Sequence, residues 1–194
     1  MPRERSFSEP DVLDLLTDAF SIHGYAGTSM TRLQEATGLG KQSLYNAFGD
    51  KQSMYLQAID CAVQRFARGA AAMQAAANGR AAVALYFDTL IQNCASADPA
   101  QQHCIVTSGL LEGVDEAPLH WALTHRWQAT HEMLRAVVER GQHDGSIANP
   151  APSAELAEVL MALTSGLRVA ARAGRSHAQM ERLVALTLGV LDKA

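Results

Sequence analysis

Apolar residues recur with helical periodicity along the whole chain. Near the N-terminus, Val12, Leu15, Leu16, Ala19 and Phe20 follow an i, i+3, i+4, i+7, i+8 spacing, which places them on one face of a helix. Later runs with the same period predict helices over residues 30–37, 41–48, 51–77, 80–94, 103–114, 117–140, 153–173 and 176–193. No run alternates as a β-strand does, so the pattern predicts an all-α protein.

Glycines and polar residues mark the expected helix ends. Gly24 and Gly38 stand where the first two helices should stop, because glycine adopts the left-handed conformation without steric cost. Ser29 precedes the second helix as an N-cap. The stretch SADPAQQ (96–102) is predicted to be a loop, and GQHDGSIANPAPS (141–153) the longest linker.

Residues 31–51, TRLQEATGLGKQSLYNAFGDK, join two short amphipathic helices through a glycine pair. Leu33 and Leu44 lie on the faces that turn inward, Gly38 permits the turn, and Leu39 fills the gap between the helices. This arrangement is typical of a helix-turn-helix, in which the second helix enters the major groove of DNA. It also fits a purely structural hairpin, since generic patterns of this kind match often.

Polar side chains crowd the start and outer face of the second helix of this pair. Lysine can donate to guanine and glutamine or asparagine can pair with adenine, whereas hydroxyl groups and helix N-termini contact phosphates. The candidate DNA-binding residues are Ser29, Thr31, Arg32, Lys41, Gln42, Ser43, Tyr45, Asn46 and Lys51.

The charge balance limits how DNA can be bound. The chain has 16 Lys+Arg, 20 Asp+Glu and a formal net charge of −4, which excludes binding by charge content alone. A DNA-binding face must therefore be positive by arrangement, helped by the partial charge of helix N-termini. Arg3 and Arg5 are candidates for a mobile arm that reaches the DNA. We expect few charged contacts and a modest dependence of affinity on salt.

Other functional classes find little support in the sequence. The three cysteines, Cys61, Cys94 and Cys104, lack C-x-x-C spacing, and the central histidines lack the i, i+4 spacing of a helical metal site. The chain has neither a signal-like start nor an apolar run of membrane-spanning length, so we expect a cytoplasmic protein. Neither a catalytic motif nor a cofactor motif is present, which disfavours an all-α enzyme.

The N-terminal segment resembles the TetR family of bacterial transcriptional repressors over roughly residues 10–58. The positions that match the family pattern are Gly24, Tyr25, Thr28, Ser29, Leu33, Gly38, Leu39, Gly40, Ser43, Leu44, Tyr45, Phe48, Asp50 and Lys51. Two positions depart from it: Gln34 stands where alanine is frequent, and Gly40 where serine is frequent. The resemblance implies a three-helix DNA-binding domain at residues 1–51 and a helical ligand-binding and dimerisation domain at residues 52–194.

The resemblance also implies how such a protein works. A homodimer would bind a near-palindromic double-stranded operator, and a small-molecule effector would release it. The last two helices would form the dimer interface, for which the candidates are Leu156, Leu160, Leu163, Leu167, Met180, Val184, Thr187 and Leu191. Burial of these residues within one chain is the alternative. The candidates for the effector pocket are Phe87, Ile91, Cys94, Cys104, Ser108, Trp121, Met161 and Arg168.

One further segment, HCIVTSGLLEG (103–113), resembles the start of a central helix in a branch of TetR-like proteins, some of which sense electrophiles. Cys104 follows His103 at the expected start of a helix, a position that lowers the pKa of thiols. The alternative function is therefore a thiol-based redox or electrophile-sensing regulator that uses Cys104. A buried cysteine that acts as a small apolar residue is the other interpretation.

Overall fold

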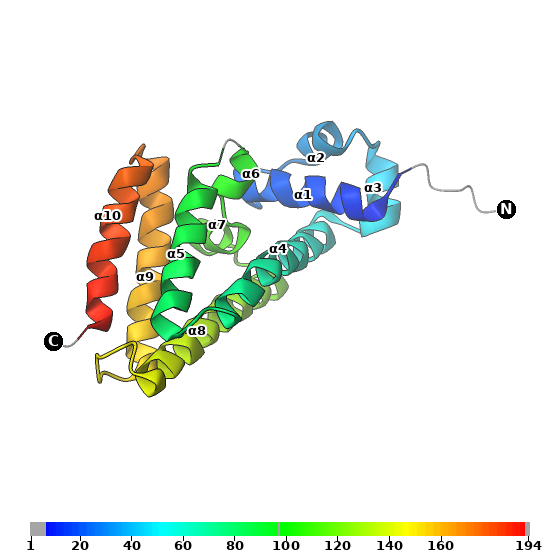
Figure 1. Cartoon of the computed structure of the whole chain (residues 1–194). Helices are drawn as coiled ribbons and strands as arrows, with labels where there is room; N and C mark the ends of the chain where they lie inside the picture. Colours follow the sequence, from blue (N-terminus) through cyan, green and yellow to red (C-terminus); the bar gives the residue numbers. More distant parts are fainter. Residues whose placement is uncertain (1–6, 97, 193–194) are drawn as a thin grey trace. The chain divides into compact units, whose positions relative to one another are not determined.

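The computed structural model describes residues 7–96 and 98–192, and all the regular secondary structure within them is helical (Figure 1). The prediction of an all-α protein is confirmed. The helices are α1 (Glu9–His23), α2 (Met30–Thr37), α3 (Lys41–Phe48), α4 (Lys51–Gln74), α5 (Gly79–Cys94), α6 (Pro99–Gln102), α7 (Ile105–Glu112), α8 (Ala117–Asp144), α9 (Ser153–Arg172), α10 (His177–Leu188) and the 3-10 helix η1 (Gly189–Leu191). Among the described residues, no helix has both the length and the apolar character needed to cross a membrane.

Several helix boundaries differ from the prediction. Helix α4 ends at Gln74 instead of residue 77, and α7 spans Ile105–Glu112 instead of residues 103–114. The expected loop at 96–102 contains α6, because Pro99 suits a first helical turn and the Asp98 carboxylate accepts a hydrogen bond from the Ala100 amide at 3.0 Å. Helix α8 continues to Asp144, since the left-handed Gly145 (φ 78°) is the residue that ends it, and the linker is shorter accordingly. Helix α10 ends at Leu188 and gives way to η1, which starts at Gly189, and the last predicted helical residue lies outside the described residues.

The chain forms two compact units that are not continuous in sequence. The first contains Met1–Arg65 and His103–Arg126, and the second contains Phe66–Gln102 and Trp127–Ala194. The three N-terminal helices therefore share a unit with α7 and the first part of α8. The division into functional domains at residue 51 stays a prediction.

The first unit has a core built from α1 to α4, α7 and the start of α8. Its largest fully buried side chains include Phe20 of α1, Leu33 of α2, Leu44 of α3 and Tyr55 of α4. The Phe20 and Tyr55 rings meet edge to face with centroids 5.0 Å apart, a favoured geometry for aromatic pairs. Each helix thus contributes its predicted apolar face to one core, which fixes α3 relative to α1 and α4.

The second unit packs α5, the later part of α8, α9 and α10 around a separate apolar core. Helices α5 and α8 approach so closely that a Cβ atom on Gly79 would lie 2.3 Å from the backbone nitrogen of Gly141. A polar pair lies inside this core, where the Tyr86 hydroxyl is 3.2 Å from the Thr164 hydroxyl. Both hydroxyls are thereby satisfied despite their burial.

Candidate DNA-binding surface

Helix α2 has the start and the end that its sequence predicts. The Ser29 side chain caps it by accepting a hydrogen bond from the Arg32 amide at 3.2 Å. At its other end Gly38 is left-handed (φ 70°), and its amide donates to the Gln34 carbonyl at 2.8 Å. This turn sets the direction in which the chain leaves α2, and Gln34 is only half-buried, so its amide group is accommodated there.

Helix α3 starts at Lys41 and presents two different faces. Leu44 and Phe48 are buried in the core of the first unit, and Leu39 packs against the same core from the turn. Gly40 precedes the helix with φ −68° and has no side chain to cap it. The predicted inward face of this helix is therefore confirmed, as is the turn that precedes it.

The opposite face of α3 is polar and exposed at its start. The side chains of Lys41, Gln42, Ser43 and Asn46 are all exposed. The Gln42 amide donates to the Asn46 side-chain oxygen at 2.9 Å, so the two amides form a pair one helical turn apart. Tyr45 is half-buried, with the Lys41 ammonium 5.7 Å from its ring centroid. The first turn of a recognition helix is where side chains meet base edges.

The start of α2 offers a second group of donors beside this helix. Ser29, Thr31 and Arg32 are exposed there. The Arg32 guanidinium donates to the His23 ring nitrogen at 3.0 Å. Burial and the neighbouring Arg32 charge lower the pKa of His23, which keeps the imidazole neutral and able to accept this bond. This hydrogen bond holds the Arg32 side chain in place.

Lys51 lies at the start of α4, half-buried and above an aromatic ring. Its ammonium is 4.4 Å from the Tyr25 ring centroid, a distance typical of cation–π contacts. Burial lowers the pKa of Lys51, and the Glu112 and Glu116 carboxylates oppose that shift. The lysine lines a concave surface that encloses a volume of about 710 Å³. The residues that line it are Tyr25, Ala26, Lys51, Glu112, Gly113, Val114, Asp115 and Glu116.

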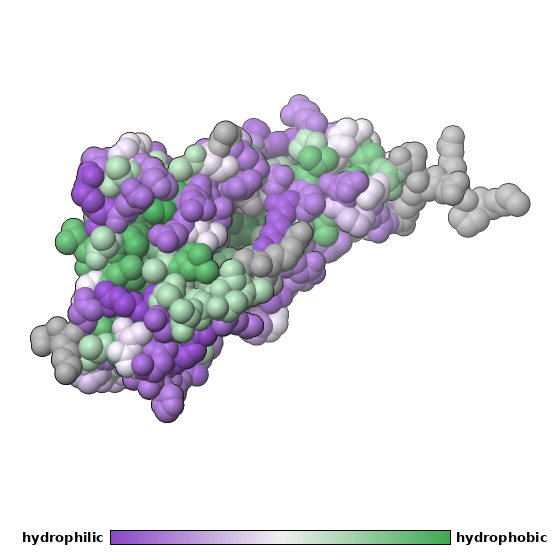
Figure 2. Space-filling model, viewed as in Figure 1, coloured by the Kyte–Doolittle hydropathy of each residue, from purple (hydrophilic) through white to green (hydrophobic). Residues whose placement is uncertain are grey.

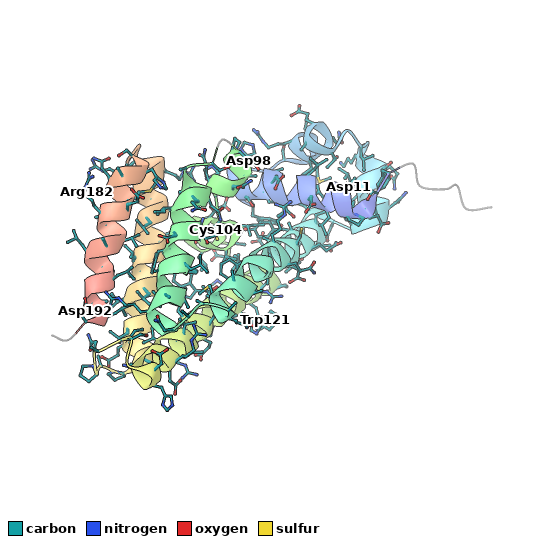
Figure 3. The ribbon with its side chains drawn as sticks, in the orientation of Figure 1. Asp11, Asp98, Cys104, Trp121, Arg182 and Asp192 are labelled. Atoms are coloured by element: carbon teal, nitrogen blue, oxygen red, sulfur yellow. The ribbon has the colours of Figure 1, made fainter. Side chains whose placement is uncertain are left out.

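The candidates for the effector pocket fall into both units. Phe87, Ile91, Cys94 and Met161 are buried in the second core, and Arg168 is half-buried beside it. Cys104, Ser108 and Trp121 belong to the first unit, where the Trp121 side chain is 66% exposed (Figure 3). Their assignment to an effector pocket stays a prediction.

Most of the candidates for the dimer interface lie inside the chain's own second core. The buried ones are Leu156, Leu160, Leu167, Met180, Val184 and Leu191, while Leu163 and Thr187 are half-buried. Their assignment to a dimer interface stays a prediction, with burial within one chain as its alternative. The exposed large apolar side chains of α9 and α10 are instead Val159, Val169, Leu183 and Leu186, and Figure 2 shows apolar surface over these helices.

Arg3 and Arg5 lie outside the described residues. Cys104 is the N-cap residue of α7, half-buried and not in a disulfide. Sequence reasoning missed two contacts of the first unit, Tyr25 with Lys51 and Glu112 with the turn after α1, because nothing local in the sequence signals either of them.

A left-handed glycine turn, a shared apolar core and a helix with an exposed polar first turn together define a helix-turn-helix DNA-binding protein. Residues 12–58 match the sequence profile described as "Bacterial regulatory proteins, tetR family". The helix-turn-helix segment of the chain is therefore of the TetR type found in these transcriptional regulators.

Known relatives resemble the chain over nearly its full length. The HTH-type transcriptional repressor ComR of Escherichia coli is 26% identical over 96% of this chain and 90% of that protein. A cysteine mutant of the TetR-family regulator CifR, solved with 26-bp operator DNA, is 27% identical with a TM-score of 0.86, over 96% of this chain and 98% of that one. The regulator FadR of Bacillus subtilis, solved with stearoyl-CoA, shares the fold at 12% identity and a TM-score of 0.76, over 94% of this chain and 99% of that one.

Proposed function

We propose that the protein is a transcriptional repressor that binds a near-palindromic operator as a homodimer, with α3 in the major groove. The observation that carries this proposal is the exposed polar start of α3, where Lys41, Gln42, Ser43 and Asn46 surround a helix fixed from below by Leu44 and Phe48. The similarity to CifR, whose structure contains operator DNA, supports it.

The side chains divide between base edges and phosphates. Lys41 and the Gln42–Asn46 pair are assigned to bases, because lysine suits guanine and a side-chain amide suits adenine. Phosphate contacts are assigned to Ser43, Tyr45 and Lys51, and to Ser29, Thr31 and Arg32 at the start of α2. These contacts fix the register of the protein on the duplex, and they carry no sequence information.

The homodimer is assigned to the outer face of α9 and α10. Val159 and Val169 of α9 and Leu183 and Leu186 of α10 are exposed there, and Leu186 is 78% exposed. Large exposed apolar side chains that gather on one face mark interaction sites. A two-fold dimer presents two copies of α3 to successive half-sites, which matches a near-palindromic operator.

A small-molecule effector is assigned to the second unit, and its binding releases the DNA. Arg168 supports an acidic effector, because its Nε atom is buried and has no hydrogen-bond partner among the described residues. Phe87, Ile91 and Met161 supply apolar surface in the same unit. Because it is proposed to act on DNA, the protein is assigned to the cytoplasm.

The experiment that tests the proposal selects bound fragments from a random pool of double-stranded DNA. We expect enrichment of a two-fold symmetric sequence whose half-sites lie about one helical turn apart. Analytical ultracentrifugation of the free protein should show a dimer. A protein that enriches no sequence, or that remains a single chain at micromolar concentration, contradicts the proposal.

A second candidate function is a thiol-based sensor that acts on the same DNA binding. The observation that favours it is the position of Cys104, half-buried at the N-terminus of α7, where thiolates are stabilised. Alkylation with N-ethylmaleimide should then weaken operator binding, and the Cys104→Ser protein should not respond. Cys61→Ser is the matched control. An equal response of the Cys104→Ser protein removes this candidate.

A further inference from the structure

The turn between α1 and α2 is held by a carboxylate from a distant part of the chain. Glu112, the last residue of α7, accepts the Tyr25 amide on Oε2 and the Ala26 amide on Oε1, each at 2.8 Å. The two bonds span 87 and 86 residues of sequence. One carboxylate thus binds two consecutive backbone N–H groups, and bonds of this kind to a charged acceptor are the strong ones.

The turn is shaped to admit this carboxylate. Gly24 begins it in the left-handed region (φ 72°), and a Cβ atom on Gly24 would lie 2.8 Å from Glu112 Oε2. The Thr28 hydroxyl closes the turn by donating to the Gly24 carbonyl at 2.6 Å. Helices α1 and α7 also pack against each other within the first unit. The contact is therefore built into the fold of this unit.

The turn positions two parts of the candidate DNA-binding surface, the start of α2 and Lys51. Ser29, the N-cap of α2, follows it directly, so the turn sets where α2 starts. The Tyr25 ring lies 4.4 Å from the Lys51 ammonium and 5.0 Å from the Tyr55 ring, which belongs to the buried core. A displacement of the turn therefore moves both the start of α2 and the lysine assigned to a phosphate.

We propose that Glu112 is a positioning residue for DNA binding: it fixes the turn that orients α2 and Lys51 without contacting the DNA. The proposal rests on the proposed function of the protein. It makes the segment His103–Arg126 part of the DNA-binding apparatus, although it is remote from the helix-turn-helix in sequence.

The test compares operator affinities of Glu112→Gln and Glu116→Gln. Both variants remove one negative charge from the same concave surface. If charge were the only effect, each variant would bind DNA at least as tightly as the wild-type protein does. Only Glu112→Gln replaces one of the two carboxylate oxygens that accept from the Tyr25 and Ala26 amides. The NH₂ group that takes its place faces a backbone N–H and cannot accept a hydrogen bond from it. We expect Glu112→Gln to weaken operator affinity about tenfold. This is the effect of lowering the fraction of protein molecules that hold the binding-competent turn to about a tenth.

A second variant, Glu112→Asp, keeps the charge but is too short to bind both amides. It should weaken the operator complex in the same direction, while Glu116→Gln does not. Amide hydrogen exchange without DNA gives an independent readout: exchange at Tyr25 and Ala26 should accelerate in both Glu112 variants, and exchange in the middle of α1 and α4 should not.

Unchanged or tighter operator binding by Glu112→Gln overturns the proposal, and so does faster exchange throughout the first unit, which indicates a general role in stability. Failure of the proposed function looks different. The wild-type protein would then enrich no operator, whatever the exchange at Tyr25 and Ala26.

Discussion

Two glycines on either side of Leu39 provide a matched test of the turn that precedes α3. A Cβ atom on either Gly38 or Gly40 meets nothing within 4 Å, so neither substitution causes a steric clash. The backbones differ, because Gly38 is left-handed with φ 70° whereas Gly40 has φ −68°. Replacing each by serine therefore compares a position where the backbone conformation is costly with one where it is not.

The expected effects have opposite signs. Serine at 38 costs about 1–2 kcal/mol for the left-handed conformation, and the smaller entropy of the unfolded chain returns about 0.4–1 kcal/mol of it. The net loss of about 1 kcal/mol corresponds to a fall in Tm of about 2–4 °C for a chain of this size. Serine at 40 should raise stability by a few tenths of a kcal/mol, since serine is a better N-cap than glycine.

Thermal unfolding followed by circular dichroism measures both effects, and operator titration shows whether α3 has moved. We expect Gly38→Ser to lower both Tm and operator affinity, and Gly40→Ser to raise Tm slightly and to leave operator affinity unchanged. Equal Tm values for the two variants, or a lower Tm for Gly40→Ser alone, would show that the left-handed turn does not position α3 as argued.

Three further changes test other parts of the molecule. Lys41→Ala should weaken operator binding by about 1–3 kcal/mol if the lysine contacts a base, and an unchanged binding isotherm removes that assignment. Leu186→Glu should shift the sedimentation of the free protein from dimer to single chain, whereas Leu111→Glu, at a residue of similar exposure (75% against 78%), should not. The Asp144 carboxylate accepts hydrogen bonds from the side chain of Ser146 and from two backbone amides, and these bonds lower its pKa from 3.8. Its stabilising contribution is present above that value and is lost as the pH falls toward the lower folded-state pKa. Asp144→Asn should therefore make the free energy of unfolding depend less on pH below pH ~4. An unchanged acid-unfolding curve would contradict a contribution of Asp144 to acid unfolding.

The sequence predicts the helix-turn-helix well because its signals are local. Ser29, Gly38 and the inward leucines each act within one or two helical turns, where spacing along the chain determines position in space. Helix α6 was missed although Pro99 is a normal residue of a first turn, because Asp98 and Pro99 also fit a loop. The last turn of α8 falls in the stretch predicted as a linker from residue 141, because glycine disfavours a helix interior, yet Gly141 lies within the helix.

The exposed apolar face assigned to the dimer and the Glu112 contact could not be predicted in the same way. Apolar residues that face the chain's own core and apolar residues that face a second copy recur with the same helical period. Spacing alone therefore could not show that Leu156 is buried while Val159 is exposed. Glu112 lies 87 residues from Tyr25, and nothing near either residue indicates that they meet. Such contacts follow from the packing of whole helices.

The shortness of α7 has a mechanical consequence. The helix spans only Ile105–Glu112, with Cys104 as its N-cap residue and the carboxylate on the turn after α1 at its far end. At a rise of 1.5 Å per residue the rod is about 12 Å long, too short to bend and absorb a tilt. Under the thiol-sensor alternative, an adduct that displaced Cys104 would act on a rigid helix whose other end holds the turn before α2.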